Sequence, residues 1–262
     1  KTLGVLAVDL DLDLWPDLVL ANDTQPNALL HNRGDGTFEE VGVASGIAFD
    51  ENGVARGAMG IDAADYDGSG RPSLVIGNFS NQMISLYHNE GRLLFMDQAA
   101  PSGIGRASLL TLAFGCVFLD LDRDGRTDLA VANGHVEESV ERVQSQVRHA
   151  QPPHLFRNLG EGRFDDVALE AGKEFASPKV ARAIAYADWD RDGDLDLALT
   201  TSGGPALLYR NDGGNARSFL ALVLEGTRSN RDGLGAVVKL TSGGVTQTSF
   251  ARGASGYLSQ SE

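Results

Sequence analysis

The chain has 262 residues, of which 36 are acidic and 22 are basic, so its formal net charge is −14. This length suffices for one large all-β domain, or for one domain with part of another. The charge argues against a nucleic acid as partner, because such binding needs clustered Lys and Arg that displace phosphate counterions. The only cysteine, Cys116, excludes an intramolecular disulfide, and no apolar run reaches the roughly 18 residues that a membrane-spanning helix needs.

An acidic loop that recurs four times defines an internal repeat. Its copies begin at Asp9, Asp65, Asp120 and Asp188, and read DLDLDLWPD, DYDGSGRPS, DLDRDGRTD and DWDRDGDLD. The first aspartates of successive copies are 56, 55 and 68 residues apart. Each loop leads into a short apolar run, DLVLAN, SLVIGN, DLAVAN or DLALTT, which is too short for a helix and typical of a strand between turns.

A second motif comes after each loop and predicts a hairpin. It reads LLHNRGDGTF, LYHNEGRLLF, LFRNLGEGRF and LYRNDGGNARSF. Asn and Gly tolerate the positive φ that a hairpin turn requires. The strand before each loop is rich in small and apolar residues, as in GVLAVDL and AFGCVFLDL, which suits the crowded inner edge of a propeller blade. The chain is therefore predicted to be all-β, with four visible four-stranded repeats that form blades of a β-propeller.

The third repeat carries extra residues at positions 134–153. It has 38 residues from its first Asp to its Asn, where the others have 23 or 24. The segment VEESVERVQSQVRHA predicts a short helix that ends before Pro152. A transition-metal site is one interpretation of His135, His149 and His154, but their spacing lacks a tight ligand pattern such as H-x₃-H. A surface excursion on one blade is the favoured interpretation.

The pattern changes after residue 217, and no further acidic loop of the repeat type occurs. We expect residues 1–217 to form the propeller repeats and residues 218–262 to open a second, small β domain that is truncated. The chain begins within a repeat and shows no signal peptide, so we expect it to be a piece of a longer protein. The later segment predicts strands near residues 220–224, 236–241 and 245–250.

The acidic loops have the composition of a calcium site. Ca²⁺ takes six to eight oxygen ligands, and side chains at loop positions 1, 3, 5 and 9 with the backbone carbonyl at position 7 can supply them. An EF-hand is excluded, because position 12 falls inside an apolar strand and supplies no bidentate Glu. The predicted ligands are Asp9, Asp11, Asp13, Asp17 and the carbonyl of Trp15; Asp65, Asp67, Ser69, Ser73 and the carbonyl of Arg71; Asp120, Asp122, Asp124, Asp128 and the carbonyl of Arg126; and Asp188, Asp190, Asp192, Asp196 and the carbonyl of Asp194.

The four loops are expected to bind with different strength. The third and fourth have four aspartates each and a turn glycine, Gly125 or Gly193, at position 6. The first has four aspartates but Leu14 at position 6, so it should bind under strain. The second has only two aspartates and should be weakest. Four bound Ca²⁺ ions would change the net charge from −14 to −6. Solvated acidic turns are the alternative, which four copies in register with a second motif disfavour.

These motifs resemble the FG-GAP, or VCBS, repeats of integrin-α-like propellers over nearly all of residues 1–217. The tail, with SNRDGLGAVV and GYLSQSE, resembles the start of an ASPIC/UnbV domain. With NGHV and PPHLFRN added, the order resembles bacterial relatives of the cartilage acidic protein family. The resemblance implies a seven-bladed propeller of which four repeats are visible, structural calcium, and an extracellular, cell-surface or periplasmic location. It also implies recognition of an extracellular protein or glycan that the sequence does not identify.

The sequence leaves three functions open. The first is a calcium-stabilised module for adhesion or for recognition of a protein or surface. The second is a carbohydrate-binding propeller, in which aromatic residues stack on sugars; Trp15 and Trp189 lie within acidic loops, although we expect them to pack between blades. The third is part of a secreted hydrolase. We expect no enzyme, because G-x-S-x-G, H-E-x-x-H and P-loop motifs are absent. Arg33-Gly34-Asp35 is interpreted as an accident of its turn.

Overall fold

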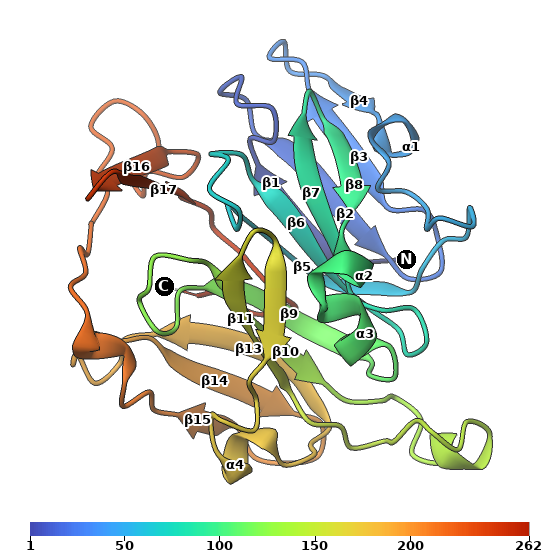
Figure 1. The fold of residues 1–262 in the computed structure, drawn as a ribbon. Coiled ribbons are helices and arrows are strands. Elements are labelled where there is room, and N and C mark those ends of the chain that lie inside the picture. The colour runs from blue at the N-terminus through green and yellow to red at the C-terminus, as the bar shows by residue number, and fades with distance from the viewer. Residues whose placement is uncertain (262) are drawn as a thin grey trace.

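The structure is a computed structural model that describes residues 1–261. Four antiparallel sheets lie side by side as propeller blades, and a separate two-stranded sheet packs against them (Figure 1). This arrangement confirms the predicted all-β fold of propeller repeats. Blade 1 contains β1 (Thr2–Val8), β2 (Asp17–Asn22), β3 (Ala28–Asn32) and β4 (Phe38–Glu40), and blade 2 contains β5 (Ala58–Ala64), β6 (Ser73–Asn78), β7 (Ser85–Gly91) and β8 (Leu94–Asp97).

Blades 3 and 4 repeat this order, but blade 4 has three strands among the described residues instead of the expected four. Short helices come after the last strand of the first three blades. Blade 3 contains β9 (Ala113–Leu119), β10 (Asp128–Asn133), β11 (His154–Gly160) and β12 (Arg163–Asp166); blade 4 contains β13 (Ala181–Ala187), β14 (Asp196–Thr201) and β15 (Leu207–Tyr209); the helices are α1 (Gly42–Ser45), α2 (Ala99–Ser102), α3 (Ile104–Ser108) and α4 (Lys173–Ala176).

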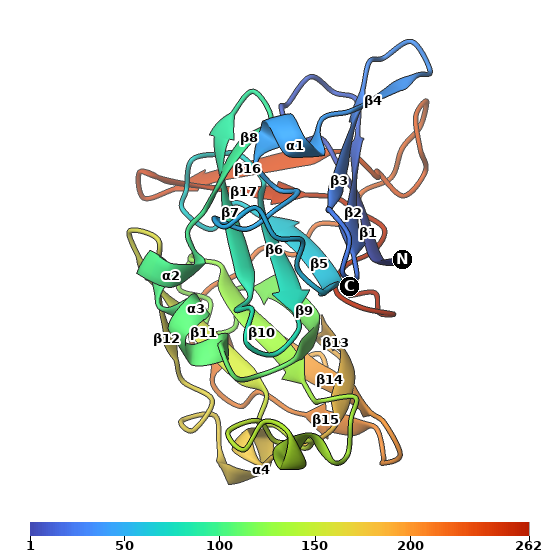
Figure 2. The same cartoon turned by 90° about the vertical axis from the view of Figure 1, so that its right-hand side faces the viewer.

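Neighbouring blades meet through their first strands, so β1, β5, β9 and β13 form the inner edge (Figure 2). Small residues make this approach possible. A Cβ atom at Gly115 of β9 would lie 2.9 Å from the carbonyl oxygen of Arg182 in β13. The predicted crowding of these strands is thereby confirmed, and Cys116 of the same strand is fully buried.

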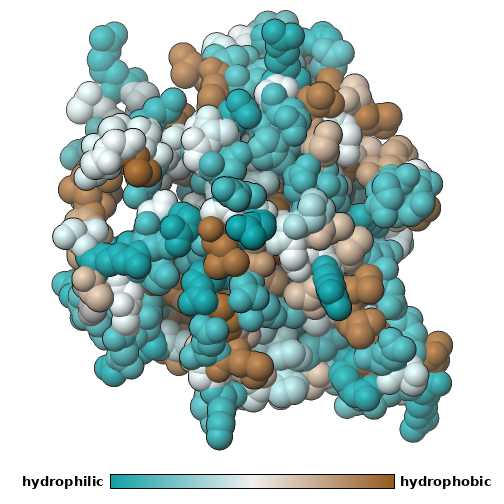
Figure 3. Space-filling model, in the orientation of Figure 1, coloured by the Kyte–Doolittle hydropathy of each residue, from teal (hydrophilic) through white to brown (hydrophobic). Residues whose placement is uncertain are grey.

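The cores lie between the blades. The core between blades 1 and 2 includes Leu10, Tyr87 and Phe95, and the core between blades 2 and 3 includes Tyr66 and Phe164. Apolar side chains on the facing sides of neighbouring sheets are buried against one another, as in stacked β-sheets. On the face shown in Figure 3, apolar residues form scattered groups among hydrophilic ones.

The predicted strand at residues 220–224 is wrong: residues 218–224 form no strand. Phe219, which the repeat would place in a fourth strand of blade 4, lies instead against the third acidic loop. The guanidinium carbon of Arg123 is 3.9 Å from the centroid of its ring. The chain leaves the blade after η2 (Gly214–Ala216), so this segment does not pair with the open edge of β15.

The helix predicted in residues 134–153 is also wrong. The structure contains only one short 3₁₀ turn there, η1 (Val140–Arg142). Of the apolar residues that the pattern offered, Val140 and Val147 are buried while Val143 is 87% exposed. An isolated helix of this length is marginal without a continuous packed face. The segment therefore forms turns, as expected of a surface excursion.

The tail contains β16 (Val237–Ser242) and β17 (Val245–Phe250), which confirms the other two predicted strands. After β17 the chain returns to the inner edge of the blades. Gly256 exchanges backbone hydrogen bonds of 3.2 and 2.9 Å with Ile61 of β5. Arg252 forms an ion pair of 2.6 Å with the fully buried Asp62. None of the described helices is long and apolar enough to cross a membrane.

Candidate metal centres

Each acidic loop joins the first strand of its blade to the second, so the four loops lie at equivalent places. The second and third loops face the β16–β17 hairpin. Gly70 of the second loop lies near Thr248 and Lys239, and Gly125 of the third lies near Gln247. The repeat therefore gathers most of the molecule's clustered carboxylates on one side, under the tail.

The four loops share one hydrogen-bonding pattern. The backbone N–H of loop position 6 donates to the carboxylate at position 1, at 2.8, 2.9, 2.9 and 3.1 Å in chain order. The side-chain oxygen at position 9 accepts a hydrogen bond from the backbone N–H of the hairpin Asn, at 2.9, 3.1, 2.8 and 2.8 Å. In the third and fourth loops, the carboxylates at positions 1 and 9 lie in one group.

Carboxylates converge in three of the loops. In the third and fourth, the aspartates at positions 1, 3 and 9 each place an oxygen within 4.8 Å of the others. In the first, positions 1, 3 and 5 form one such group, and positions 3 and 9 form a second with His31. Asp124 and Asp192, at position 5, lie outside these groups, and Asp124 forms an ion pair with Arg126. The groups are Asp120, Asp122 and Asp128; Asp188, Asp190 and Asp196; Asp9, Asp11 and Asp13; and Asp11, Asp17 and His31.

The electrostatics of these groups suit a cation. Burial raises the pKa of Asp120 above its ordinary value and that of Asp128 to about 7. Neighbouring carboxylates also raise both pKa values, whereas hydrogen bonds from backbone N–H groups lower them. Burial likewise raises the pKa of Asp11, whose Oδ1 is buried and accepts no hydrogen bond among the described residues. A bound cation would supply the missing partner. The all-oxygen donor sets of the third and fourth loops fit a hard cation such as Ca²⁺ better than a softer metal such as Zn²⁺.

The second loop brings no such group together. Its Asp67 carboxylate is engaged by His88, whose Nε2 lies 2.6 Å from Oδ2, and Ser73 Oγ accepts the hydrogen bond from Asn89. Ser69, at position 5, can offer a cation only a neutral hydroxyl oxygen from its side chain. That the second loop is the weakest site stays a prediction.

The first loop is strained where the sequence predicts it. Leu14 has a φ of 79°, close to the 85° of Gly125 at the same position of the third loop, and Leu12 also has a positive φ of 64°. A left-handed conformation costs a non-glycine residue roughly 1–2 kcal/mol. The loop adopts it nonetheless, because the Leu14 N–H must reach the Asp9 carboxylate.

Sequence reasoning missed two histidines beside the loops. His31 Nδ1 lies 3.0 Å from Asp17 Oδ1, and His88 contacts Asp67. Both histidines directly precede the hairpin Asn, a position that Arg157 and Arg210 occupy in the later repeats. This replacement of Arg by His is the sequence feature that could have indicated their role beside the loops. The carbonyl ligands at Trp15, Arg71, Arg126 and Asp194 stay predictions.

The two tryptophans do not pack between blades, contrary to expectation. Trp15 is 50% exposed and Trp189 is 40% exposed. Trp15 lies instead against Gly34 in the hairpin of its own blade, where a Cβ atom would meet its Nε1 at 2.8 Å. Trp189 lies at loop position 2, where Leu10 and Tyr66 are buried in the cores between blades, and none of the described sheets forms a further blade beside blade 4 to cover it.

Residues 9–76, which include the first two acidic loops, match the family described as FG-GAP-like repeat. Residues 226–262 match the family described as ASPIC and UnbV. The chain carries an FG-GAP-like repeat and an ASPIC/UnbV segment. It is distantly similar to cartilage acidic protein 1 of Homo sapiens, with 26% identity over 253 residues, and of Xenopus tropicalis, with 25% over 256. These matches cover 94% of this chain but only 35% and 36% of those proteins, so the chain spans about a third of their length.

Two solved structures show weaker likeness. An Agrocybe aegerita lectin, described as recognising non-reducing terminal N-acetylglucosamine, matches with a TM-score of 0.43 and 20% identity, over 80% of this chain and 53% of its own. The V. cholerae biofilm matrix protein Bap1 matches with a TM-score of 0.39 and 14% identity, over 75% of this chain and 23% of its own. At these scores neither structure identifies the function of this chain.

Proposed function

We propose that the chain is a calcium-binding β-propeller module that recognises another protein or a surface, in which calcium is structural. The observation that carries the proposal is the convergence of three carboxylates, at equivalent positions, in the third and fourth loops. Without a cation these carboxylates repel one another at short range. The ions rigidify the loops under the β16–β17 hairpin and perform no chemistry, so the role is not enzymatic.

Thermal unfolding tests the calcium part of the proposal. The melting temperature should be higher in millimolar Ca²⁺ than in EDTA, since a ligand that binds only the folded state stabilises it by about 1.4 kcal/mol per site at ten times its dissociation constant. The double variant Asp120→Asn/Asp188→Asn should lose most of this gain. Equal melting temperatures in Ca²⁺ and EDTA would overturn the proposal.

We further propose an extracellular, cell-surface or periplasmic location. Calcium sites of extracellular modules typically fill at roughly 0.1–1 mM, which is the range available outside the cytosol. The distant similarity to cartilage acidic protein 1 supports the same proposal. Fractionation of the source cells, with detection of the full-length protein, tests it; a strictly cytosolic protein would contradict it.

Carbohydrate binding is the second candidate, favoured by the exposed ring of Trp15. An aromatic face open to solvent beside a rigid loop can stack on a sugar, and such stacking needs few other contacts. A glycan array probed in Ca²⁺ and in EDTA tests this function. Calcium-dependent binding that Trp15→Ala abolishes, with the melting temperature retained, would favour the lectin role over protein recognition.

A further inference from the structure

The first acidic loop differs from the others because a histidine faces two of its carboxylates. His31 Nδ1 lies 3.0 Å from Asp17 Oδ1 and 3.9 Å from Asp11 Oδ2. One oxygen of each carboxylate and a ring nitrogen of the histidine all lie within 4.8 Å of one another. We call these three residues the His31 group. Among the described residues, it is the one cluster of this kind that contains a histidine.

All three residues of the His31 group belong to blade 1. Asp11 and Asp17 occupy positions 3 and 9 of the loop, and the pairing of β3 with β2 brings His31 beside them. Backbone hydrogen bonds fix Asp17, whose Oδ2 accepts from the N–H of Leu10 at 3.1 Å and whose Oδ1 accepts from that of Asn32 at 2.9 Å. One loop and one hairpin therefore assemble the group, without a residue from a neighbouring blade.

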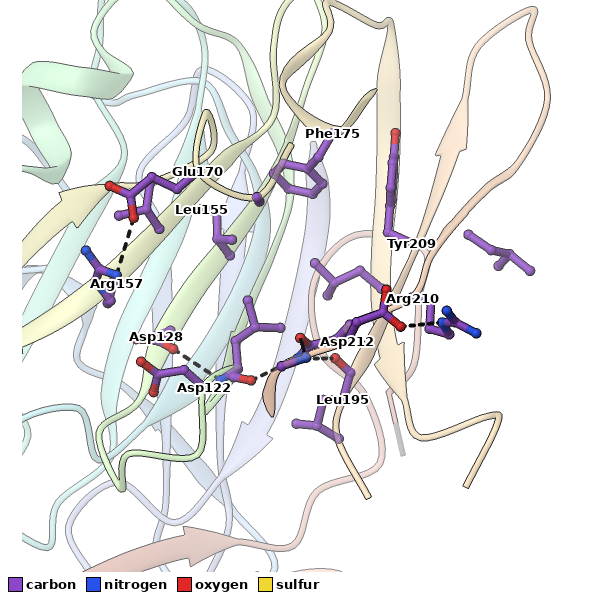
Figure 4. A pocket seen from close by; sticks show the side chains of 17 residues that line it. Asp122, Asp128, Leu155, Arg157, Glu170, Phe175, Leu195, Tyr209, Arg210 and Asp212 are labelled. Carbon is purple, nitrogen blue, oxygen red and sulfur yellow. Dashed lines mark hydrogen bonds and ion pairs between the residues drawn. The ribbon is translucent and has the colours of Figure 1, made fainter. Parts of the chain in front are cut away.

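The later blades have no metal ligand at the place of His31. Arg157 and Arg210 occupy this position in blades 3 and 4. Figure 4 shows Arg157 in an ion pair with Glu170, at 3.4 Å. Arg210 likewise pairs with Asp212, at 2.7 Å. A guanidinium group has only N–H donors and a positive charge, so it cannot bind a cation as a ligand.

Blade 2 has the histidine but lacks the second carboxylate. His88 Nε2 lies 2.6 Å from Asp67 Oδ2, and its Nδ1 lies 2.8 Å from Glu90 Oε1. Position 9 of this loop is Ser73, which offers only a neutral hydroxyl group. Each ring nitrogen of His88 is thus engaged by a different carboxylate, whereas one nitrogen of His31 faces two.

The His31 group has more negative charge than its histidine can balance. Even a protonated imidazole leaves one of the two carboxylates uncompensated, and Asp9 and Asp13 lie close to Asp11. Asp11 Oδ1 is buried and accepts no hydrogen bond among the described residues. A divalent cation among the three residues would balance this charge and take the place of the proton between His31 and Asp17.

The imidazole decides which cation suits the group. Ca²⁺ is a hard cation that takes six to eight oxygen ligands, so a nitrogen among them disfavours it. Zn²⁺ and Co²⁺ bind imidazole nitrogen together with carboxylate oxygen, and three protein ligands leave Zn²⁺ a fourth position for water. The His31 group therefore does not fit the cation that the third and fourth loops fit.

We propose that the His31 group binds a divalent transition metal such as Zn²⁺, so that the first loop and the calcium loops select different metals. Asp11 also belongs to the group that it forms with Asp9 and Asp13, so this metal competes with Ca²⁺ for the first loop. The inference goes beyond the calcium role of the third and fourth loops and does not depend on it.

Titration of the whole chain with Zn²⁺ in millimolar Ca²⁺ tests the inference, because Ca²⁺ then fills the sites that prefer it. Isothermal calorimetry should show one Zn²⁺ ion whose binding depends on His31. His31→Arg, which introduces the residue of the later blades, should weaken this binding by more than the roughly 10–100-fold that loss of an outer partner of a metal site costs. His31→Gln should do the same while it retains a hydrogen-bond donor for Asp17, and circular dichroism should show both variants folded.

His88→Arg is the matched control, since it makes the same change at the equivalent position of blade 2 and should leave Zn²⁺ binding unchanged. X-ray absorption at the zinc edge should show one imidazole nitrogen among oxygen ligands. Zinc binding that survives both His31 variants, that falls equally in His88→Arg, or that millimolar Ca²⁺ abolishes would overturn the inference. Equal melting temperatures in Ca²⁺ and EDTA would overturn the calcium proposal alone, because the zinc titration reports on the first loop.

Discussion

The residue at position 6 sets how much backbone strain each acidic loop stores. Leu14 adopts a φ of 79° with its side chain 83% exposed, so it gains little packing in return. Leu14→Gly should therefore stabilise the chain by about 0.5–1 kcal/mol, the relief of left-handed strain less the entropy of the added glycine. Urea denaturation in Ca²⁺ measures the change.

The third loop offers the reverse substitution as a control. Gly125→Leu should destabilise the chain, because it introduces the same strain and its Cβ atom would meet the Gln247 amide nitrogen at 2.7 Å. If Leu14→Gly lowers stability instead, position 6 of the first loop is held by packing of its side chain, and the strain account is wrong.

At the scale of elements, the hairpin asparagines join the blades. Asn158 is fully buried and bonds both to Tyr66 of the previous blade and to Thr127 of its own, at 2.8 and 2.9 Å. Asn158→Ala should cost about 2 kcal/mol or more, because it leaves buried carbonyl groups without a donor.

Asn211 makes the corresponding bonds at the end of the array, where it is partly exposed. Water can replace its side chain there, so Asn211→Ala should cost about 1 kcal/mol or less. Thermal unfolding of the two variants in the same buffer compares them. An equal or larger loss for Asn211→Ala would contradict the view that these bonds stabilise blade contacts in proportion to burial.

Local pattern predicted the elements whose partners lie nearby in sequence. The predicted strand at residues 245–250 is β17 itself, because its partner β16 precedes it across a two-glycine turn. The strand predicted at residues 220–224 is absent because the chain turns from the open β15 edge toward the third acidic loop, where Phe219 lies against Arg123, and spacing alone does not reveal this course. His31 was missed for a similar reason: it reaches Asp17 only through the pairing of β2 with β3.

At the scale of the whole molecule, the tail is tied to the blades by a buried ion pair. Asp62 is fully buried and accepts hydrogen bonds from the backbone of Phe118 and Ala63 in addition to Arg252. Arg252→Met should cost about 3–5 kcal/mol, because it leaves an uncompensated buried carboxylate. Burial raises the pKa of Asp62, and without Arg252 it should rise further.

The raised pKa of Asp62 makes this loss depend on pH. A carboxyl group whose folded pKa is raised above its unfolded value binds more protons in the folded state, so stability falls as pH rises between the two values. The loss in Arg252→Met should therefore be smaller at pH 5 than at pH 8. Urea denaturation at both pH values tests this, and Asp62→Asn/Arg252→Met should recover part of the loss. A pH-independent loss would indicate that Arg252 acts through packing alone.

Direct measurement of calcium binding tests the central claim, that the repeated acidic loops are calcium sites of unequal strength. Isothermal titration of the metal-free chain with Ca²⁺ should show about two tight ions, with weaker binding beyond them. Asp120→Asn and Asp188→Asn should each remove one tight ion, whereas Asp65→Asn should leave both. No calcium binding, or tight binding that survives Asp120→Asn and Asp188→Asn together, would contradict the account.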